Sequence, residues 1–554
     1  MAARRPAQIT VVKQLVSLLK MPSVSVLNLT VNYTLAIDLS SSFSTLAADN
    51  QVSVQVIQKG DCPNMNFPRF WVDEKRDRVY TYGGEYSYLN PWVSPASIPL
   101  EELWTFEPSG DAGTWVNIDQ SSNSVWNSLT RPSEGAATFG SIGGFNLGGY
   151  HTSRSSQKTN IGGTIPSPGL QFYNFTDLSW TNNSALGYSD DGTSSFSTIT
   201  WVPTWGPAGL LVAVGGESSF NLADDSGASY VPMNNISVFE PLTQTWYQQT
   251  ATGDIPQQRG QACMVGVGSS DNSTYGKYSV EMTHTRTASE TDLNIEIFLY
   301  SGQLTALYDN TAATADFNLA SDAVYILTLP AFNWIKVNYT PTDPRVYHTC
   351  HVIGNRQLLS VGGLNPALLN ASLAWNEADQ FAEGLKIFDM TTLNWTNYYD
   401  ANAAPYERSN LLKQYYASNP RYPAEWGDEA LGWILNSTSK PPPPPPHHRQ
   451  TGTIVGGVVG GVGGLFVVFA ILAFILYKQR KAKTAAEQEA ERRRRLNEKP
   501  PAHFRGELES TPPKCSGSSS YMGEMESPGS CFPGYVVGTA ELEARAAKVY
   551  ELGV

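Results

Sequence analysis

Apolar residues recur along this 554-residue chain in short runs that end in glycine. Five runs share this form: VYTYGGE, FNLGGYH, LLVAVGGE, IFLYSGQ and LLSVGGL. Short runs rich in Val, Leu, Tyr and Phe are typical of β-strands, and terminal glycines indicate a backbone conformation that other residues rarely adopt. The pairs that end the runs are Gly83 and Gly84, Gly148 and Gly149, Gly215 and Gly216, Ser301 and Gly302, and Gly362 and Gly363.

A tryptophan follows each run after an alternating segment and a turn. The five are Trp115, Trp180, Trp246, Trp334 and Trp395, spaced by 65, 66, 88 and 61 residues. The first members of the glycine pairs are spaced by 65, 67, 86 and 61 residues, so two independent markers share one irregular rhythm. In four units an aromatic residue or leucine precedes the tryptophan by seven positions, which spans one tight turn. The repeat therefore predicts a hairpin that closes on the tryptophan.

Each unit predicts a four-stranded antiparallel sheet with apolar residues on both faces, and several such sheets bury these faces by packing around an axis. The fold class is therefore all-β, and residues 27–400 are predicted to form a β-propeller of about six blades whose first blade is incomplete. That incomplete blade is NYTLAIDLSSSFS at 32–44, which predicts a third strand and a hairpin with Phe43 near the tryptophan position. Two strands are missing before it, and an exposed inner sheet edge is a feature that proteins avoid.

The glycine doublet, the following aromatic residue and the tryptophan of the third hairpin resemble the kelch repeat. The resemblance covers roughly residues 30–400 and implies a kelch-type β-propeller. These units exceed the usual kelch length of about 50 residues, and the fourth matches least well because Ser301 replaces the first glycine. The order of segments further resembles fungal single-pass membrane proteins with a kelch ectodomain, a Pro/Ser-rich stalk, a Gly-rich membrane helix and a short tail.

Residues 453–477 read TIVGGVVGGVGGLFVVFAILAFILY, a stretch without a charged residue. About 20 apolar residues suffice to cross a bilayer, and the Lys and Arg residues that follow at once indicate a cytoplasmic C-terminal side. The sequence predicts one transmembrane helix. Its glycines have the small-xxx-small spacing of helix association, although glycine is also common in such helices, so homodimerisation is one of two interpretations of Gly456, Gly457, Gly460, Gly461 and Gly464.

Ten N-x-S/T sequons all precede this segment, which agrees with an extracellular or lumenal N-terminal region of a glycoprotein. They are Asn28, Asn32, Asn174, Asn182, Asn235, Asn272, Asn338, Asn370, Asn394 and Asn436. Residues 1–477 carry 24 Lys and Arg against 39 Asp and Glu. This negative balance opposes binding to phosphate backbones, so nucleic acid is excluded as an expected partner.

The remaining segments flank these two regions. Residues 1–26 do not have the pattern of a signal peptide, and we expect an incorrectly assigned start there that replaces a signal peptide and the missing strand pair. The alternative is a divergent first blade that residues 1–30 close as poor strands. Residues 401–435 predict short helices, and 436–452 a Pro-rich stalk with polyproline II geometry. Residues 478–554 predict a mostly disordered cytoplasmic tail with an unknown partner, whose Arg492–Arg495 run is either a lipid-binding cluster or a topology signal.

Candidate chemistry is sparse. His348 and His351 are the one suggestive pair, but their spacing points them to opposite faces of a strand, which disfavours copper ligation. Cys263 and Cys350 open the first strands of neighbouring units, and sheets stack about 10 Å apart, so both are expected to be buried thiols. No catalytic, cofactor or metal residue is predicted.

Two functions fit this organisation. The first is a membrane-anchored binding or sensing protein, at the plasma membrane by default, whose propeller engages an extracellular protein or glycan; loops on a rigid scaffold generally carry such binding. The alternative is a membrane-tethered enzyme acting on carbohydrate, related to kelch-type oxidases. The missing metal ligands favour the first.

Overall fold

The structure of the protein is a computed structural model. It describes residues 33–436 apart from 47–48, 50–51, 53, 64, 87–101, 110–111, 157–158, 160–163, 219–229, 269–293, 305–321, 341, 364, 366–380 and 382–383. The predictions for residues 1–26, the stalk beyond Asn436, the membrane segment 453–477 with its glycines, and the tail all lie outside this part. Within it, no helix has the length and apolar character needed to cross a membrane.

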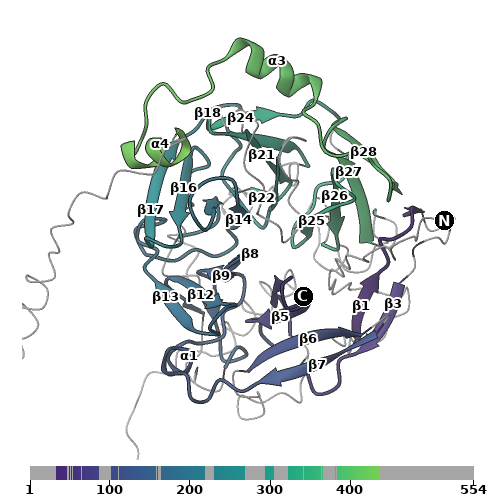
Figure 1. The fold of residues 1–554 in the computed structure, drawn as a ribbon, viewed down its shortest axis with the longest axis vertical. Helices are drawn as coiled ribbons and strands as arrows, with labels where there is room; N and C mark the ends of the chain where they lie inside the picture. The colour runs from purple at the N-terminus through teal and green to yellow at the C-terminus, as the bar shows by residue number, and fades with distance from the viewer. Residues whose placement is uncertain are drawn as a thin grey trace, which may run out of the picture. The chain divides into compact units, whose positions relative to one another are not determined.

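Five antiparallel sheets in the described residues form blades around a common axis (Figure 1). Each blade runs from an inner first strand to an outer fourth strand, and blade 4 gains a fifth strand, β18 (Thr252–Gly253), parallel to β24. The all-β class and the propeller architecture are confirmed. The blades are β4 (Arg69–Asp73), β5 (Arg78–Tyr82), β6 (Leu103–Ser109) and β7 (Ala112–Ile118); β8 (Ala136–Gly140), β9 (Gly143–Leu147), β12 (Leu170–Asn174) and β13 (Trp180–Asn183); β14 (Thr198–Val202), β15 (Leu210–Val214), β16 (Asn235–Glu240) and β17 (Thr245–Thr250); β20 (Cys263–Gly268), β21 (Ile295–Tyr300), β23 (Val324–Leu329) and β24 (Asn333–Lys336); and β25 (Thr349–Ile353), β26 (Gln357–Val361), β27 (Leu385–Asp389) and β28 (Asn394–Thr396).

The seven-residue offset before the tryptophans is a cross-strand register. Phe239 of β16 lies directly opposite Trp246 of β17, and their rings are 4.9 Å apart. The same pairing joins Tyr173 to Trp180, Leu327 to Trp334 and Phe388 to Trp395. Side chains of directly opposed residues pack against each other, so the third hairpin of these four blades is closed by a large apolar pair.

The expected count of about six blades is one too high, and the interpretation of residues 32–44 is wrong in its pairing. β1 (Tyr33–Ile37) pairs with β3 (Val54–Gln58), not with the residues around Phe43. This two-stranded sheet lies between blades 5 and 1, because Ile37 packs with blade 5 while Ala36 and Ile57 pack with blade 1. A wedge of two strands therefore fills the place of a sixth blade.

Phe43 instead belongs to β2 (Phe43–Ser44), which pairs with β29 (Tyr398–Tyr399) beyond blade 5. The rings of Phe43 and Tyr399 are 5.0 Å apart, and the Tyr399 hydroxyl donates to the Leu39 carbonyl at 3.0 Å. The sequence pattern missed this contact because its partner is more than 350 residues away. The first described strands and the last thus hold each other at the junction of the ring.

The prediction of two buried thiols at Cys263 and Cys350 is also wrong. The two residues form a disulfide between β20 and β25, with their Cα atoms 5.5 Å apart. The sheet-stacking distance of about 10 Å applies to parallel layers. Blades radiate from an axis, so their innermost strands converge and reach the distance that a disulfide requires.

Short elements complete the described chain. α1 (Ser124–Ser128) follows blade 1, and its N-cap Asn123 accepts a hydrogen bond from the Trp126 N–H at 3.0 Å. Two further small sheets each have one strand directly after a glycine pair, and two helices follow the last blade. These elements are β10 (Tyr150–His151) with β11 (Ile165–Pro166), β19 (Arg259–Gly260) with β22 (Gln303–Leu304), α3 (Asn410–Ser418) and α4 (Glu429–Asn436).

The segment from Tyr406 to Asn436 packs against blades 3 and 4. Tyr406 and Leu412 are fully buried in a cluster with Phe298 of β21, whereas Leu431 and Leu435 of α4 join the core that blades 3 and 4 share. An ion pair reinforces this contact, because Arg408 Nε lies 3.1 Å from Oε1 of Glu296, a buried carboxylate in β21.

Replacing Glu296 with glutamine is expected to flatten the dependence of stability on pH. Burial raises the pKa of Glu296 to about 7, while Arg408, Tyr416 and Tyr406 face the carboxyl and oppose the shift only in part. The Glu296 carboxyl therefore binds its proton near pH 7 in the folded chain and near pH 4.5 in the unfolded chain. The stability gained from this difference in proton binding is fully present below pH 4.5 and is lost as pH rises through 7.

Thermal melts from pH 8 to pH 5 measure the effect. As pH falls, the melting temperature of the wild type is expected to rise relative to that of Glu296→Gln. Glu407→Gln is the matched control, because the Glu407 side chain is 65% exposed and its pair with Lys413 spans 3.9 Å. Parallel profiles for the wild type and Glu296→Gln would contradict the prediction.

Candidate functional site

The glycine pairs join neighbouring blades through the backbone. Both members of each pair have positive φ, from 56° at Ser301 to 100° at Gly302. The N–H of the second member donates to a carbonyl at the start of the next blade in four bonds: Gly84 to Pro132 (2.7 Å), Gly149 to Ser194 (2.7 Å), Gly216 to Arg259 (2.9 Å) and Gly302 to Arg345 (3.0 Å). A Cβ on Gly148 would lie 2.2 Å from the Ser194 carbonyl oxygen of the next blade, so this approach requires glycine.

Ser301 explains why the fourth unit departs from the pattern. It adopts φ 56°, and its buried hydroxyl donates to the Arg345 carbonyl at 2.9 Å and accepts from the Arg345 N–H at 2.7 Å. The side chain thus makes hydrogen bonds to the next blade that offset the cost of its backbone conformation.

The tryptophans also contact the preceding sheet. Four donate a hydrogen bond from Nε1: Trp115 to Thr34 Oγ1 (2.8 Å), Trp180 to Gln120 Oε1 (3.1 Å), Trp246 to the Ser184 carbonyl (2.8 Å) and Trp334 to the Met233 carbonyl (3.0 Å). The Trp395 ring packs 4.7 Å from that of Tyr300 in blade 4. The repeat residues therefore hold neighbouring blades together, which is a structural role.

A ring of five equivalent residues surrounds the axis, one in each blade and each two positions before the inner strand. All five adopt φ between 54° and 61°, and we name them the axial collar: Phe67, Glu134, Phe196, Gln261 and Tyr347. The Phe196 N–H donates to the Glu134 carbonyl at 3.0 Å, and the Gln261 N–H donates to the Phe196 carbonyl at 2.9 Å. The Phe67 and Tyr347 rings meet at 5.6 Å between blades 1 and 5.

The collar combines aromatic and polar side chains. Phe67, Phe196 and Tyr347 are half-buried, whereas Glu134 and Gln261 are buried. Aromatic faces that remain partly open at a rigid turn are suited to stacking against a ligand. The sequence did not reveal the collar, because its five residues are of four types and none is the glycine or asparagine that usually marks positive φ.

Glu134 is the charged member of the collar. Its Oε2 accepts from Arg69 Nη2 at 3.2 Å, and Oε1 has no hydrogen-bond partner among the described residues. Burial raises the pKa of Glu134 to about 7, which the Arg69 guanidinium opposes. The carboxyl therefore changes its protonation state near neutral pH.

Two buried arginines next to the collar are already engaged. Arg259 Nη1 donates to the Ser301 carbonyl at 2.9 Å, and Arg345 Nη1 donates to the Gly362 and Gly363 carbonyls at 3.0 and 2.9 Å. The Arg345 guanidinium also lies 3.6 Å from the centre of the Phe381 ring. Both arginines therefore stabilise the backbone just after a second strand, β21 in blade 4 and β26 in blade 5.

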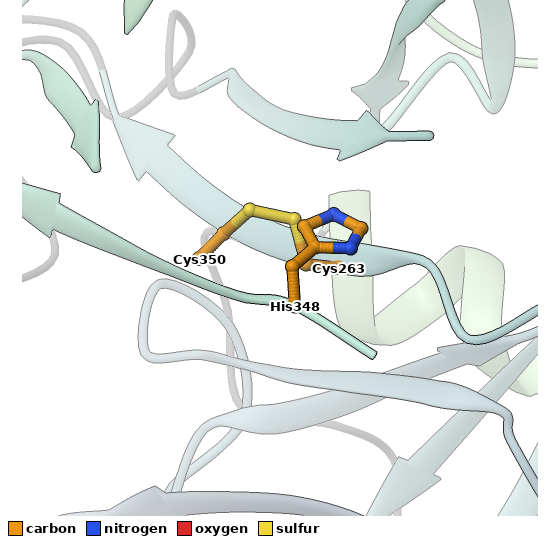
Figure 2. Close-up of side chains that lie close together, drawn as sticks. All are labelled: Cys263, His348 and Cys350. Atoms are coloured by element: carbon orange, nitrogen blue, oxygen red, sulfur yellow. A yellow bond between two sulfur atoms is a disulfide. The ribbon is translucent and has the colours of Figure 1, made fainter. Parts of the chain in front are cut away.

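His348 follows the collar residue Tyr347 and lies beside the disulfide of Cys263 and Cys350. Figure 2 shows its imidazole next to the disulfide, at the Cys263 end. Burial lowers the pKa of His348 to about 3, the charge of Arg345 adds to the shift, and a backbone contact with Tyr300 opposes it. That contact lacks hydrogen-bond geometry, and neither ring nitrogen has a partner among the described residues.

The other sequence candidates are dispersed. His351 lies within β25 opposite Leu359, whereas His348 precedes that strand, and among the described residues the pair gathers no third ligand of its own. Cys62 is a buried free thiol whose pKa burial raises to about 12, so it is unreactive.

Six of the ten sequons lie in the described part of the chain. Asn182, Asn338, Asn394 and Asn436 are exposed, and Asn174 and Asn235 are half-buried. The Asn182 Nδ2 donates to the Pro168 carbonyl at 3.2 Å. Asn28, Asn32, Asn272 and Asn370 lie outside the described residues.

Comparison with known proteins adds one relative. A stretch of 360 residues is 24% identical to the kelch repeat-containing protein of Arthroderma benhamiae, and it covers 58% of this chain and 46% of that protein. Together with the five blades, the similarity supports a kelch propeller family. A kelch-type propeller suggests a role in protein interaction. No family model matches the chain, which spans less than half the length of the relative.

Proposed function

We propose that the protein is a membrane-anchored binding protein of the cell surface, whose kelch-type propeller binds an extracellular protein or glycan at the axial collar. Residues 453–477 would anchor it as a single-pass helix, with residues 478–554 in the cytoplasm. The charge-free stretch, the basic residues after it and the sequons before it support this topology.

The observation that carries the binding role is the collar itself. Three half-buried aromatic rings, a carboxyl and an amide are held on residues of one backbone conformation around one axis. Interblade hydrogen bonds hold the backbone at Glu134, Phe196 and Gln261, so little conformational entropy is lost when a ligand orders these residues. Aromatic residues on rigid supports carry much of the energy in known interfaces.

A binding role rather than catalysis is part of the proposal. Among the described residues, Cys263, His348 and Cys350 are the one group of three His, Cys, Asp or Glu side chains near enough to share a metal ion, and its two sulfurs are bonded to each other. The histidine pair of the sequence therefore offers no support for kelch-oxidase chemistry.

The test is binding of the purified full-length chain to a glycan and protein array. Phe196→Ala is expected to weaken binding of the ligand found there by about 30-fold, the size of an interface hot spot. Trp433→Ala is the matched control, because Trp433 is 57% exposed on α4 and belongs to no collar contact. Equal binding by the two variants would reject the collar as the site.

A further inference from the structure

We propose that reduction of the Cys263–Cys350 disulfide creates a metal site. The two thiolate sulfurs and one ring nitrogen of His348 would then ligate a cation that prefers sulfur and imidazole, such as Zn²⁺. In the oxidised chain the same residues hold no ion, because each sulfur is bonded to the other.

The three side chains are already gathered. Their ligand atoms lie within 4.8 Å of one another, and Figure 2 shows the imidazole at the Cys263 end of the disulfide. Zinc bonds of about 2.3 Å to sulfur and about 2.0 Å to nitrogen place tetrahedral ligands roughly 3.5–4 Å apart. Small rotations of the side chains after cleavage of the disulfide reach that geometry.

The backbone keeps the ligands together once the covalent bond is gone. Cys263 lies in β20 and Cys350 in β25, the inner strands of adjacent blades, with Cα atoms 5.5 Å apart. Val265 and Val352 pack in the cluster that joins blades 4 and 5. The thiols therefore stay close without the disulfide.

Packing accounts for the ring of His348, which lies edge to face against that of Tyr300 at 5.1 Å, but not for its two nitrogens. His348 is 5% exposed, and neither of its ring nitrogens has a hydrogen-bond partner among the described residues. A buried polar group without a partner is costly, so an imidazole held within 4.8 Å of both sulfurs points to an ion that these three residues bind together once the disulfide is reduced.

A dithiol supplies the electrons that reduce the disulfide. Two electrons and two protons convert the Cys263–Cys350 disulfide into two thiols, while the dithiol becomes a disulfide. The metal ion then displaces the two thiol protons as it binds, and the His348 nitrogen donates a lone pair. Three protein ligands leave a fourth position for water, as in open zinc sites.

Cobalt(II) is the probe, because tetrahedral thiolate ligation gives it charge-transfer and visible absorption. The full-length chain would carry Cys62→Ser, Cys515→Ser and Cys531→Ser, so that Cys263 and Cys350 supply the only thiols. After reduction with a phosphine, which becomes its oxide, one cobalt ion per chain is expected. The oxidised chain is expected to show no such absorption.

His348→Gln is expected to weaken cobalt binding at least about tenfold. His351→Gln, three residues away in β25, is expected to leave it unchanged and is the matched control. Cys263→Ser is expected to abolish the charge-transfer band while circular dichroism shows the chain still folded.

Stability gives an independent readout. Zn²⁺ is expected to raise the melting temperature of the reduced chain and not that of the oxidised chain. Equal cobalt binding by oxidised and reduced chains, equal loss in the two histidine variants, or unfolding on reduction without rescue by Zn²⁺ would overturn the proposal.

Discussion

Replacing Gly363 with alanine is expected to lower the free energy of unfolding by about 3 kcal/mol or more. Gly363 has φ 83°, and a Cβ there would lie 2.6 Å from the Val346 carbonyl oxygen and 2.8 Å from the His348 Cβ. The substitution therefore combines left-handed strain with a clash against backbone that cannot rotate away. Urea unfolding of the full-length chain measures the loss.

The neighbouring glycine supplies the control. Gly362 has φ 64°, and nothing lies within 4 Å of the position of its Cβ. Gly362→Ala is expected to cost only the conformational term, about 1 kcal/mol. Equal losses for the two variants would show that packing between the doublet and the start of its blade contributes nothing.

Replacing both cysteines of the disulfide with alanine is expected to lower the free energy of unfolding by about 4 kcal/mol. The bond closes a loop of 87 residues between blades 4 and 5, so its removal returns much conformational entropy to the unfolded chain. Guanidinium unfolding under non-reducing conditions compares the wild type with Cys263→Ala/Cys350→Ala.

Cys62→Ala is the control for loss of a buried sulfur without loss of a cross-link. Cys62 is 4% exposed and free, so a cost of about 1 kcal/mol is expected from packing alone. If the free energy of unfolding of the double variant is no lower than that of Cys62→Ala, the prediction is wrong, and the inner strands converge without help from the disulfide.

Contacts within a blade were predictable because they connect residues close in sequence. The step from Phe239 to Trp246 spans one turn, and the pair is directly opposed in the hairpin. The glycine pairs likewise marked positions that need positive φ, as at Gly149. Strand propensity, turn length and backbone freedom are local properties, so the repeat sequence predicts them.

Contacts between blades were not predictable in the same way. The assumption of stacked layers placed Cys263 and Cys350 too far apart, whereas radiating blades bring their Cα atoms to 5.5 Å. Phe43 was assigned to a hairpin of its own, yet its partner is Tyr399 at the other end of the described propeller. Both contacts depend on how the blades are arranged around the axis, which no single repeat unit contains.

The sequence by itself determined the repeat, the strand order within each unit and the glycine positions, because these follow from short-range pairing and backbone sterics. Only the tertiary structure decided the number of complete blades, the wedge of β1 and β3, the disulfide with His348 beside it, and the axial collar. The physical reason is that five positions with unlike side chains, of four residue types, become equivalent only when the blades place them at the same turn around one axis.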